Sequence, residues 1–414
     1  MIPIKGHLKY IIFSYFVTFS NIVTGLILFP MILKSEGSAA LGIFGLLFSS
    51  KSVIDMGLGW LSSSMTKELL HATSQSIFNK KATLSFIINT TYGSIVSIAL
   101  CIYGLNYQTE YSLSYVYFSI YAFISFVIIP FYEILNSRLQ QHQTQFFRFI
   151  QQFLFMLLSI GSYSFLRHLD YIFLSLFLSS LLTTILVYRY IFYHIDFKFS
   201  FTEHYKKIIY KVFISQGKKY FLNGISTIML LQIDILIIGY LYGKSSAGIY
   251  LIIWKIPNTL IMLGWKLSEP LQIYFGNNYP SNIPTLNIMY FKYERLIFLA
   301  GIIASFGYFS SGKFIMDIWL GDNSYPQITY MFTIMSLMTF LGIIQRFYVN
   351  INYYTKGIEI VTKLQIIDIT FKILATLILY PYFKEASPIV GWVISYIITL
   401  PMYRINSMRI LKTK

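Results

Sequence analysis

The sequence has little charge. Only 12% of its 414 residues are charged, roughly half the fraction found in an ordinary soluble domain, and 56% are hydrophobic. No polar linker divides the chain, although a soluble chain of this length would split into several linked domains. This composition excludes a soluble multidomain protein and favours an integral membrane protein.

Cysteines and catalytic motifs are also scarce. Cys101 is the single cysteine, so the chain cannot form an internal disulfide. All six histidines fall in predicted loops or tails, and no His-Glu-x-x-His, Walker or Gly-x-Ser-x-Gly pattern occurs. These absences argue against an enzyme and predict neither a metal nor a cofactor. The first apolar run, 10–33, is too long for the core of a signal peptide and is expected to be the first spanning helix.

Apolar stretches of about 20 residues recur along the whole chain, which is the length a helix needs to cross about 30 Å of hydrocarbon. The predicted fold class is therefore an all-α integral membrane protein with twelve transmembrane helices. Their predicted positions are 10–33, 41–63, 82–105, 112–132, 146–166, 171–193, 220–242, 247–268, 296–312, 327–349, 358–381 and 387–404.

Basic residues are distributed unevenly between the predicted loops. With the N-terminus in the cytoplasm, 23 lysines and arginines fall on the cytoplasmic side and 5 on the outer side. This bias predicts a multi-pass protein with both termini in the cytoplasm. Topology and attraction to anionic lipid explain the net charge of +16, so no nucleic-acid partner is expected.

The layout of the predicted spans is bipartite. A basic hydrophilic segment at 196–219, the predicted cytoplasmic linker, separates a six-helix bundle at 1–195 from a second one at 220–414. The segment Ala-Leu-Gly-Ile-Phe around Gly42 is echoed by Ser-Ala-Gly-Ile-Tyr around Gly248, 206 positions later. Parallel repeats of this kind commonly form two bundles around a central cavity, and they alternate access by rocking.

Charged side chains inside spans are costly, at about 2.5–3.5 kcal/mol near mid-bilayer, so each needs a reason. Lys51 and Asp55 lie four residues apart and can pair on one helix face. Asp368 and Lys372 have the same spacing and are predicted to form a structural pair. Either pair is consistent with simple neutralisation or with a functional role.

Asp234 has only apolar neighbours three and four residues away, so no local cation neutralises it. It must face a cavity, meet a cation on another helix or be protonated, and Lys255 is the expected partner. Since a desolvated carboxylate suits proton or sodium coupling, Asp234 and Asp55 are predicted to couple ions. Lys51 and Lys255 occupy nearly corresponding places in the two halves and are predicted as cavity cations for a phosphate-bearing substrate.

Several segments resemble the bacterial polysaccharide flippases, which include the O-antigen flippases of the multidrug/oligosaccharidyl-lipid/polysaccharide (MOP) exporter superfamily. The resemblance covers essentially the whole chain and lies in the joint pattern. The matching segments are Gly42–Leu47, Ile54–Leu58, Thr66–Glu68, Gln232–Asp234, Ile238–Gly239, Ala247–Tyr250 and Ile318–Gly321.

The resemblance implies a MATE-like fold, two six-helix bundles around a central cavity. It also implies a substrate, an undecaprenyl-pyrophosphate-linked oligosaccharide such as an O-antigen or capsule repeat unit. A flippase would move this unit from the cytoplasmic to the periplasmic leaflet of the inner membrane, by alternating access coupled to H⁺ or Na⁺. Other proteins of polysaccharide assembly would be its partners.

Two alternatives remain at the level of sequence. The first is an ion-coupled multidrug exporter of the same superfamily, which would share the fold and the deep aspartate. The second is an enzyme, an O-antigen polymerase or glycosyltransferase. The short outer loops argue against the enzyme, because such enzymes display a large periplasmic loop.

Overall fold

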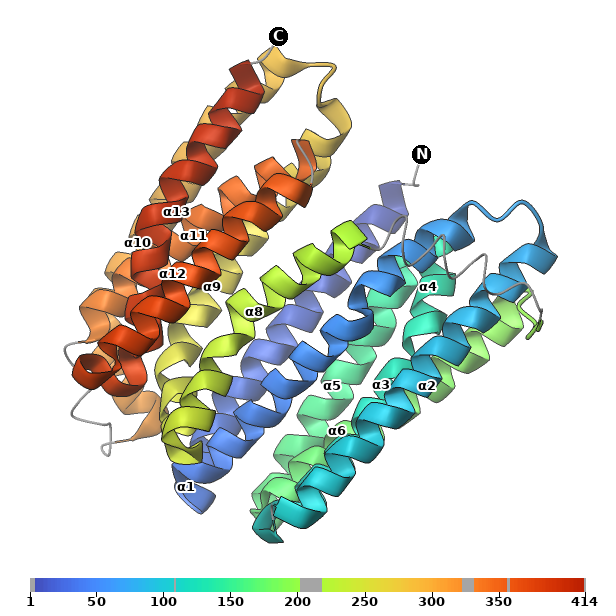
Figure 1. The fold of residues 1–414 in the computed structure, drawn as a ribbon, viewed down its shortest axis with the longest axis horizontal. Helices are drawn as coiled ribbons and strands as arrows, with labels where there is room; N and C mark the ends of the chain where they lie inside the picture. The colour runs from blue at the N-terminus through green and yellow to red at the C-terminus, as the bar shows by residue number, and fades with distance from the viewer. Residues whose placement is uncertain (1–3, 108, 202–217, 322–330, 356–357, 413–414) are drawn as a thin grey trace. The chain divides into compact units, whose positions relative to one another are not determined.

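The computed structural model describes residues 4–107, 109–201, 218–321, 331–355 and 358–412. Most of the predicted cytoplasmic linker, 196–219, therefore lies outside the described residues. The described residues are almost entirely helical and contain no strand (Figure 1). Contacts divide the chain into two units, Met1–Phe221 (unit 1) and Leu222–Lys414 (unit 2), which we describe separately.

Unit 1 is an antiparallel helical bundle. Its closest helix pairs are α2 with α3, α1 with α5, α5 with α6, and α3 with α6. A turn at Ile128 divides α3 from α4, which begins with Pro130 in its first turn, where the missing proline N–H is tolerated. The helices are α1 (Ile4–Leu70), α2 (Gln75–Tyr107), α3 (Ser112–Val127), α4 (Ile129–Ser137), α5 (Gln141–Leu166) and α6 (Leu169–His194).

Unit 2 has a similar composition of long apolar helices. Its closest pairs are α12 with α13, α10 with α11, α9 with α11, and α11 with α13. The helices are α8 (Lys218–Tyr242), which begins just before the unit boundary, α9 (Lys244–Asn278), α10 (Ile283–Leu320), α11 (Met331–Thr355), α12 (Ile358–Phe383) and α13 (Ser387–Lys412).

Helix α1 contains two predicted spans joined by a bend at Gly37. Gly37 has φ 82° and ψ −176°, a conformation that glycine adopts readily and side-chain-bearing residues rarely adopt. Gly243, between α8 and α9, has φ 92° and ψ 168°. The two glycines lie 206 positions apart, as do Gly42 and Gly248, so the backbone conformation repeats where the sequence repeats.

Ten helical stretches among the described residues are long and apolar enough to cross a membrane. Two of these hold two predicted spans each, since Lys9–Asp55 passes through the Gly37 bend and Glu359–Leu411 includes both α12 and α13. The predicted all-α membrane class is confirmed, and the chain is a multi-pass membrane protein. Several helices, such as α10, run well past the predicted ends, because helical structure continues beyond the apolar stretch.

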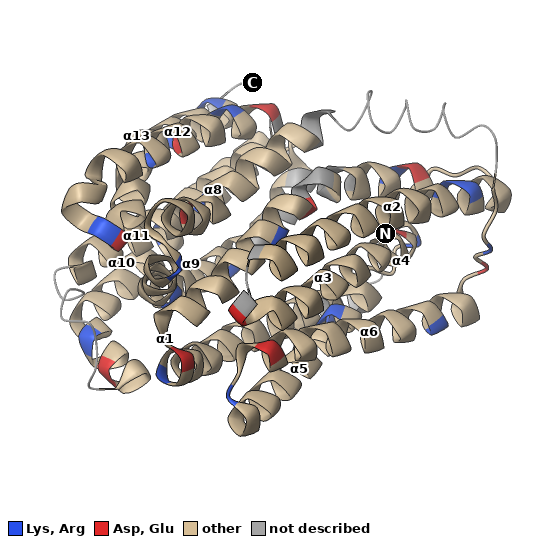
Figure 2. Ribbon diagram, turned by 60° about the horizontal axis from the view of Figure 1, so that its bottom comes forward, with Lys and Arg blue, Asp and Glu red and all other residues tan. Residues whose placement is uncertain are grey.

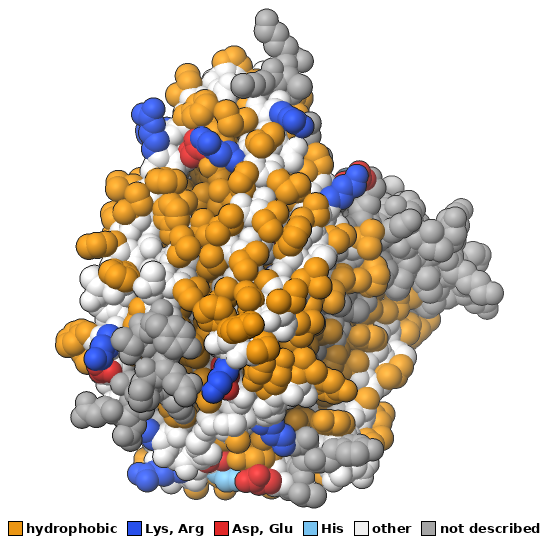
Figure 3. Space-filling view, turned by 60° about the vertical axis from the view of Figure 1, so that its left-hand side comes forward, with side chains coloured by type: hydrophobic (Ala, Val, Ile, Leu, Met, Phe, Trp, Pro, Cys, Tyr) orange, Lys and Arg blue, Asp and Glu red, His pale blue; other side chains and the backbone are white. Residues whose placement is uncertain are grey.

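Side chains are distributed as a bilayer requires. In Figure 2 most charged positions lie near helix ends, and few lie along the helix middles. The face drawn in Figure 3 carries a broad apolar band with most of its visible charged side chains above and below it. Large apolar residues such as Phe165 and Tyr240 are 88% and 89% exposed, which suits contact with lipid.

Candidate functional site

Asp234 of α8 is the centre of a buried polar network in unit 2. It is 2% exposed, and three other helices supply its partners. Lys372 Nζ of α12 lies 2.9 Å from Asp234 Oδ1. Trp392 Nε1 of α13 donates to Asp234 Oδ2 at 2.7 Å, and the Tyr250 hydroxyl of α9 donates to the same oxygen at 3.1 Å. Four helices of unit 2 therefore meet at one carboxylate.

The cation beside Asp234 is Lys372, so the prediction that Lys255 would be its partner is wrong. Asp234 does meet a cation on another helix, which was one of the three predicted outcomes. Lys255 is half-buried on α9, five residues after Tyr250. Five residues correspond to a rotation of about 140° around a helix, so the face that presents Tyr250 to Asp234 turns Lys255 elsewhere.

The predicted pair of Asp368 with Lys372 is also corrected. Asp368 is fully buried and accepts hydrogen bonds from Gln345 of α11 and, at 3.1 Å, from Thr399 of α13. Lys372 instead directs its ammonium toward Asp234 and the Leu230 carbonyl of α8. The ammonium also lies 4.2 Å from the Trp392 ring centre, so carboxylate, carbonyl and ring together favour this direction.

The network contains more acid than base. Asp234, Asp368 and Lys372 are each no more than 2% exposed, and Lys372 is the ammonium in direct contact with the two-carboxylate network. A buried carboxylate without a compensating positive charge costs several kcal/mol. The second carboxylate is therefore chemically suited to hold a proton or a small cation.

Lys51 and Asp55 of α1 form the pair that their spacing predicts. Lys51 Nζ lies 2.6 Å from Asp55 Oδ2, and Lys51 is 8% exposed. The ammonium also lies 5.4 Å from the centre of the Tyr121 ring. Because Asp55 already neutralises it, Lys51 is less available to a phosphate than an unpaired lysine would be.

A polar cavity of about 270 Å³ lies within unit 2 and was not predicted. Its walls combine one guanidinium with three carboxamides, a hydroxyl and a phenol. These groups come from three helices, α8, α11 and α12, so no single sequence motif marks them. The polar lining residues are Asn223, Thr227, Arg346, Asn350, Tyr353 and Gln365.

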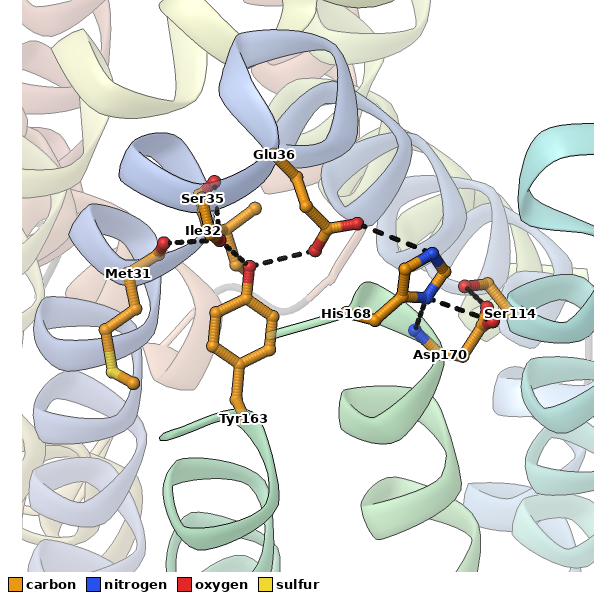
Figure 4. A network of polar contacts seen from close by, with 8 residues as sticks. All are labelled: Met31, Ile32, Ser35, Glu36, Ser114, Tyr163, His168 and Asp170. Carbon is orange, nitrogen blue, oxygen red and sulfur yellow. Dashed lines mark hydrogen bonds and ion pairs between the residues drawn. The ribbon is translucent and has the colours of Figure 1, made fainter. Parts of the chain in front are cut away.

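A second polar network, in unit 1, was also not predicted (Figure 4). The Tyr163 hydroxyl of α5 donates to Glu36, beside the Gly37 bend, at 2.8 Å. His168, at the start of α6, lies 3.9 Å from Glu36 through Nε2 and 3.1 Å from Asp170 through Nδ1. The two ring nitrogens of His168 thus lie near different carboxylates, and Nδ1 also accepts a hydrogen bond from the backbone N–H of Asp170 at 3.4 Å. No group of His, Cys, Asp and Glu among the described residues fits a metal ion.

Glu133 is a buried acid that the sequence analysis left outside the membrane. The fourth span was predicted to end at 132, whereas the structure continues α4 to Ser137. Glu133 is 1% exposed and contacts Ser85 of α2. The signal that could have included it is the apolar run that continues after it, Ile134 and Leu135.

The sequence matches no protein-family profile, and no curated protein is similar enough to count as a relative. Solved structures nevertheless share the fold. An inward-facing multidrug resistance MATE transporter of the MOP superfamily has a TM-score of 0.79 at 13% identity, covering 94% of this chain and 96% of that one.

Two further structures give the same result. A MOP superfamily transporter from Pyrococcus furiosus, described as having a binding pocket of reversed polarity, has a TM-score of 0.70 at 14% identity, over 99% of this chain and 97% of its own. An outward-facing MATE transporter has a TM-score of 0.65 at 15% identity, over 98% and 95%. Identities this low establish the fold alone, and the fold of this chain is that of the MATE transporters.

Proposed function

We propose that this chain is an ion-coupled transporter that flips a lipid-linked oligosaccharide across the bacterial inner membrane, with both termini in the cytoplasm. The observation that carries the proposal is the buried network of two carboxylates and one ammonium in unit 2. Intramembrane ionisable residues of this kind mark ion pathways in transporters. The MATE fold supports transport over enzymatic chemistry, and the resemblance to polysaccharide flippases supports the substrate.

Coupling would work through the position of Lys372. With a proton or Na⁺ on Asp368, Lys372 neutralises Asp234, as the observed 2.9 Å contact has it. Loss of that ion leaves Asp368 charged one turn away on the same helix, where it competes for the ammonium. Movement of Lys372 toward Asp368 would weaken its contacts with Asp234 and the Leu230 carbonyl, and so loosen α12 from α8.

The polar cavity of unit 2 supports a substrate that carries both phosphate and hydroxyl groups. The Arg346 guanidinium has the planar fork that matches phosphate oxygens. The carboxamides of Asn350 and Gln365 can each donate and accept hydrogen bonds to sugar hydroxyls. We further propose that Lys51 and Lys255 are additional cations that bind the undecaprenyl pyrophosphate. Lys51 would keep its ion pair with Asp55 while it does so.

The test is reconstitution of the purified protein in liposomes with a labelled lipid-linked oligosaccharide. The measurement is the fraction of label reached by a membrane-impermeant glycosidase under a proton or sodium gradient. Gradient-dependent flipping is expected in the wild type and in Asp196→Asn, whose side chain is exposed, and is expected to be lost in Asp368→Asn. Flipping that ignores both gradients would exclude ion coupling.

A multidrug exporter is the second candidate, because the solved MATE transporters share the fold and the coupling network suits drug export equally well. Competition by cationic drugs separates the two. Drug accumulation that the lipid-linked oligosaccharide does not inhibit would favour the exporter. In cells, loss of every O-unit from the lipopolysaccharide on gene deletion supports a flippase. Retention of a single-unit band would instead favour a polymerase.

A further inference from the structure

Glu133 of α4 is the most deeply buried of the carboxylates described in unit 1, and the proposed coupling network does not use it. Its sequence neighbours Tyr132 and Ile134 are buried as well, and they belong to an apolar cluster to which all six helices of unit 1 contribute. An ionised carboxylate in such surroundings needs a cation or a full set of hydrogen-bond donors.

Several charged and titratable groups on the helices packed against α4 have neighbours other than Glu133. Within the described residues, no lysine or arginine contacts Glu133. Two ion pairs are closed: Lys81 of α2 with Glu68 of α1 at 2.7 Å, and Lys51 with Asp55 of α1 at 2.6 Å. Arg148 of α5 lies 5.3 Å from the centre of the Tyr132 ring, and Tyr121 of α3 lies beside Lys51. The Tyr190 hydroxyl of α6 donates to Gln140.

The hydrogen bonds around Glu133 show that the Ser85 hydroxyl donates to the Glu133 carboxyl group. The Asn89 amide nitrogen donates to the Ser85 carbonyl at 2.9 Å, which sets the orientation of that amide because a carbonyl only accepts. The same nitrogen lies 3.2 Å from the Ser85 hydroxyl oxygen, which therefore accepts from it. The Ser85 hydroxyl hydrogen is left for Glu133 Oε2, where the structure places the bond.

The other oxygen of Glu133 is the unusual one. Oε1 is fully buried and receives no hydrogen bond from any group among the described residues. A carboxylate oxygen that bears charge would need such a donor, whereas the O–H of a neutral carboxyl does not. The Ser62 hydroxyl of α1 also interacts with this carboxyl. A hydroxyl can donate to an ionised carboxylate or accept from a neutral carboxyl, so Ser62 alone does not decide between the two forms.

We infer that Glu133 is a proton-binding site of unit 1, holding its proton on Oε1 while Ser85 donates to Oε2. The site joins three helices, because Glu133 lies on α4, Ser85 and Asn89 on α2, and Ser62 on α1. Loss of the proton would place an uncompensated charge inside the apolar cluster and disfavour this packing. Glu133 lies five residues before Arg138, the first exposed residue after α4, so a separation of these helices at that end would be its shortest route to water along α4.

The meaning of this site for transport rests on the proposed function, but its protonation does not. The direct measurement is the infrared C=O stretching band of a protonated carboxyl, recorded for the purified full-length protein at neutral pH. The infrared difference spectrum, wild type minus Glu133→Gln, should contain that band. Glu110→Gln, which changes an exposed acid of the same unit, should leave the band unchanged.

A difference spectrum that shows loss of a carboxylate-ion band in place of the protonated band would overturn the inference. Glu133→Gln should also keep the wild-type melting temperature, because an amide closely mimics the neutral acid. If that variant folds poorly, Glu133→Asp gives a second comparison, in which the band should shift and remain present.

In liposomes, Glu133→Gln should lower the proton flux that accompanies transport. A wild type that moves no lipid-linked substrate would refute the proposed function and leave the infrared result standing.

Discussion

Lys372 lies 2.9 Å from Asp234 on another helix, although Asp368 is one turn away on its own helix. The ammonium thus ties α12 to α8 and leaves the nearer carboxylate to Gln345 and Thr399. The buried site therefore holds an ion pair between two helices and a second acid outside that pair. The stability and transport activity expected of each variant follow from this arrangement.

Asp234→Asn should destabilise the protein, because it leaves the Lys372 charge buried without its partner. Breaking a buried ion pair in this way costs about 3–5 kcal/mol. The double variant Asp234→Asn with Lys372→Gln should recover most of that loss, since it removes both charges. Thermal unfolding in detergent measures both effects, with Asp196→Asn as the exposed control. Equal destabilisation by the single and double variants would show that the ion pair is not the cause.

Asp368→Asn should leave stability intact and abolish ion coupling, in contrast to the destabilising Asp234→Asn. It removes the excess negative charge of the network and keeps one amide oxygen that can accept from Gln345. The amide nitrogen can donate to the Thr399 hydroxyl oxygen, because that hydroxyl can direct its own hydrogen to the Ser395 carbonyl. We expect an unchanged or higher melting temperature and loss of the response to a proton or sodium gradient. Flux assays in liposomes give the second measurement, and a variant that remains fully gradient-driven would remove Asp368 from the coupling scheme.

Arg346→Met should weaken binding of a pyrophosphate lipid by about tenfold or more, because hydrogen bonds to charged groups contribute about 1.5–3 kcal/mol. Arg346→Lys should recover only part of the affinity, since it restores the charge without the planar fork. Lys292→Met removes an exposed charge of the same unit outside the cavity and is the matched control. Equal effects of Arg346→Met and Lys292→Met would indicate general electrostatic attraction.

Gly391→Ala should disturb the network without touching any of its side chains. An added Cβ would lie 2.7 Å from the Lys372 carbonyl oxygen, so α12 and α13 would have to separate. Overpacking of this kind costs about 1–3 kcal/mol. It should also shift Trp392, the next residue, away from Asp234, which tryptophan fluorescence can report. Gly161→Ala, whose Cβ would meet nothing within 4 Å, should be neutral in the same assays.

The fold could be predicted largely from the sequence because membrane insertion imposes one strong rule. A backbone in hydrocarbon must satisfy its own hydrogen bonds, so each run of about 20 apolar residues becomes a helix. The bend at Gly37 and its counterpart at Gly243 could not be predicted from apolarity. Their position in the repeat was nevertheless implied by the echo between Gly42 and Gly248.

The polar sites could be predicted only in part, because partner choice depends on helix packing. The spacing of Lys51 and Asp55 is a local property, and that pair forms as expected. Asp234 was recognised as needing a partner, but whether Lys255 or Lys372 supplies it depends on which helix faces α8. Glu133 was missed for a different reason. Predicted span ends are uncertain by a few residues, and a charge near such an end is assigned to the loop.

The Gly37 bend has a mechanical consequence. Two spans of α1 meet there with no loop between them, so the junction has no slack. A flexible loop would distribute a rotation between two helices over many backbone bonds. Here the two helical parts of α1 are joined by one residue, so the rotation falls on the φ and ψ angles of Gly37. An added Cβ at Gly37 would meet nothing within 4 Å, so the constraint is one of backbone conformation alone. Helix α1 is thus two helical arms joined at a single residue, so any change of the angle between the arms has to be made by the dihedrals of Gly37.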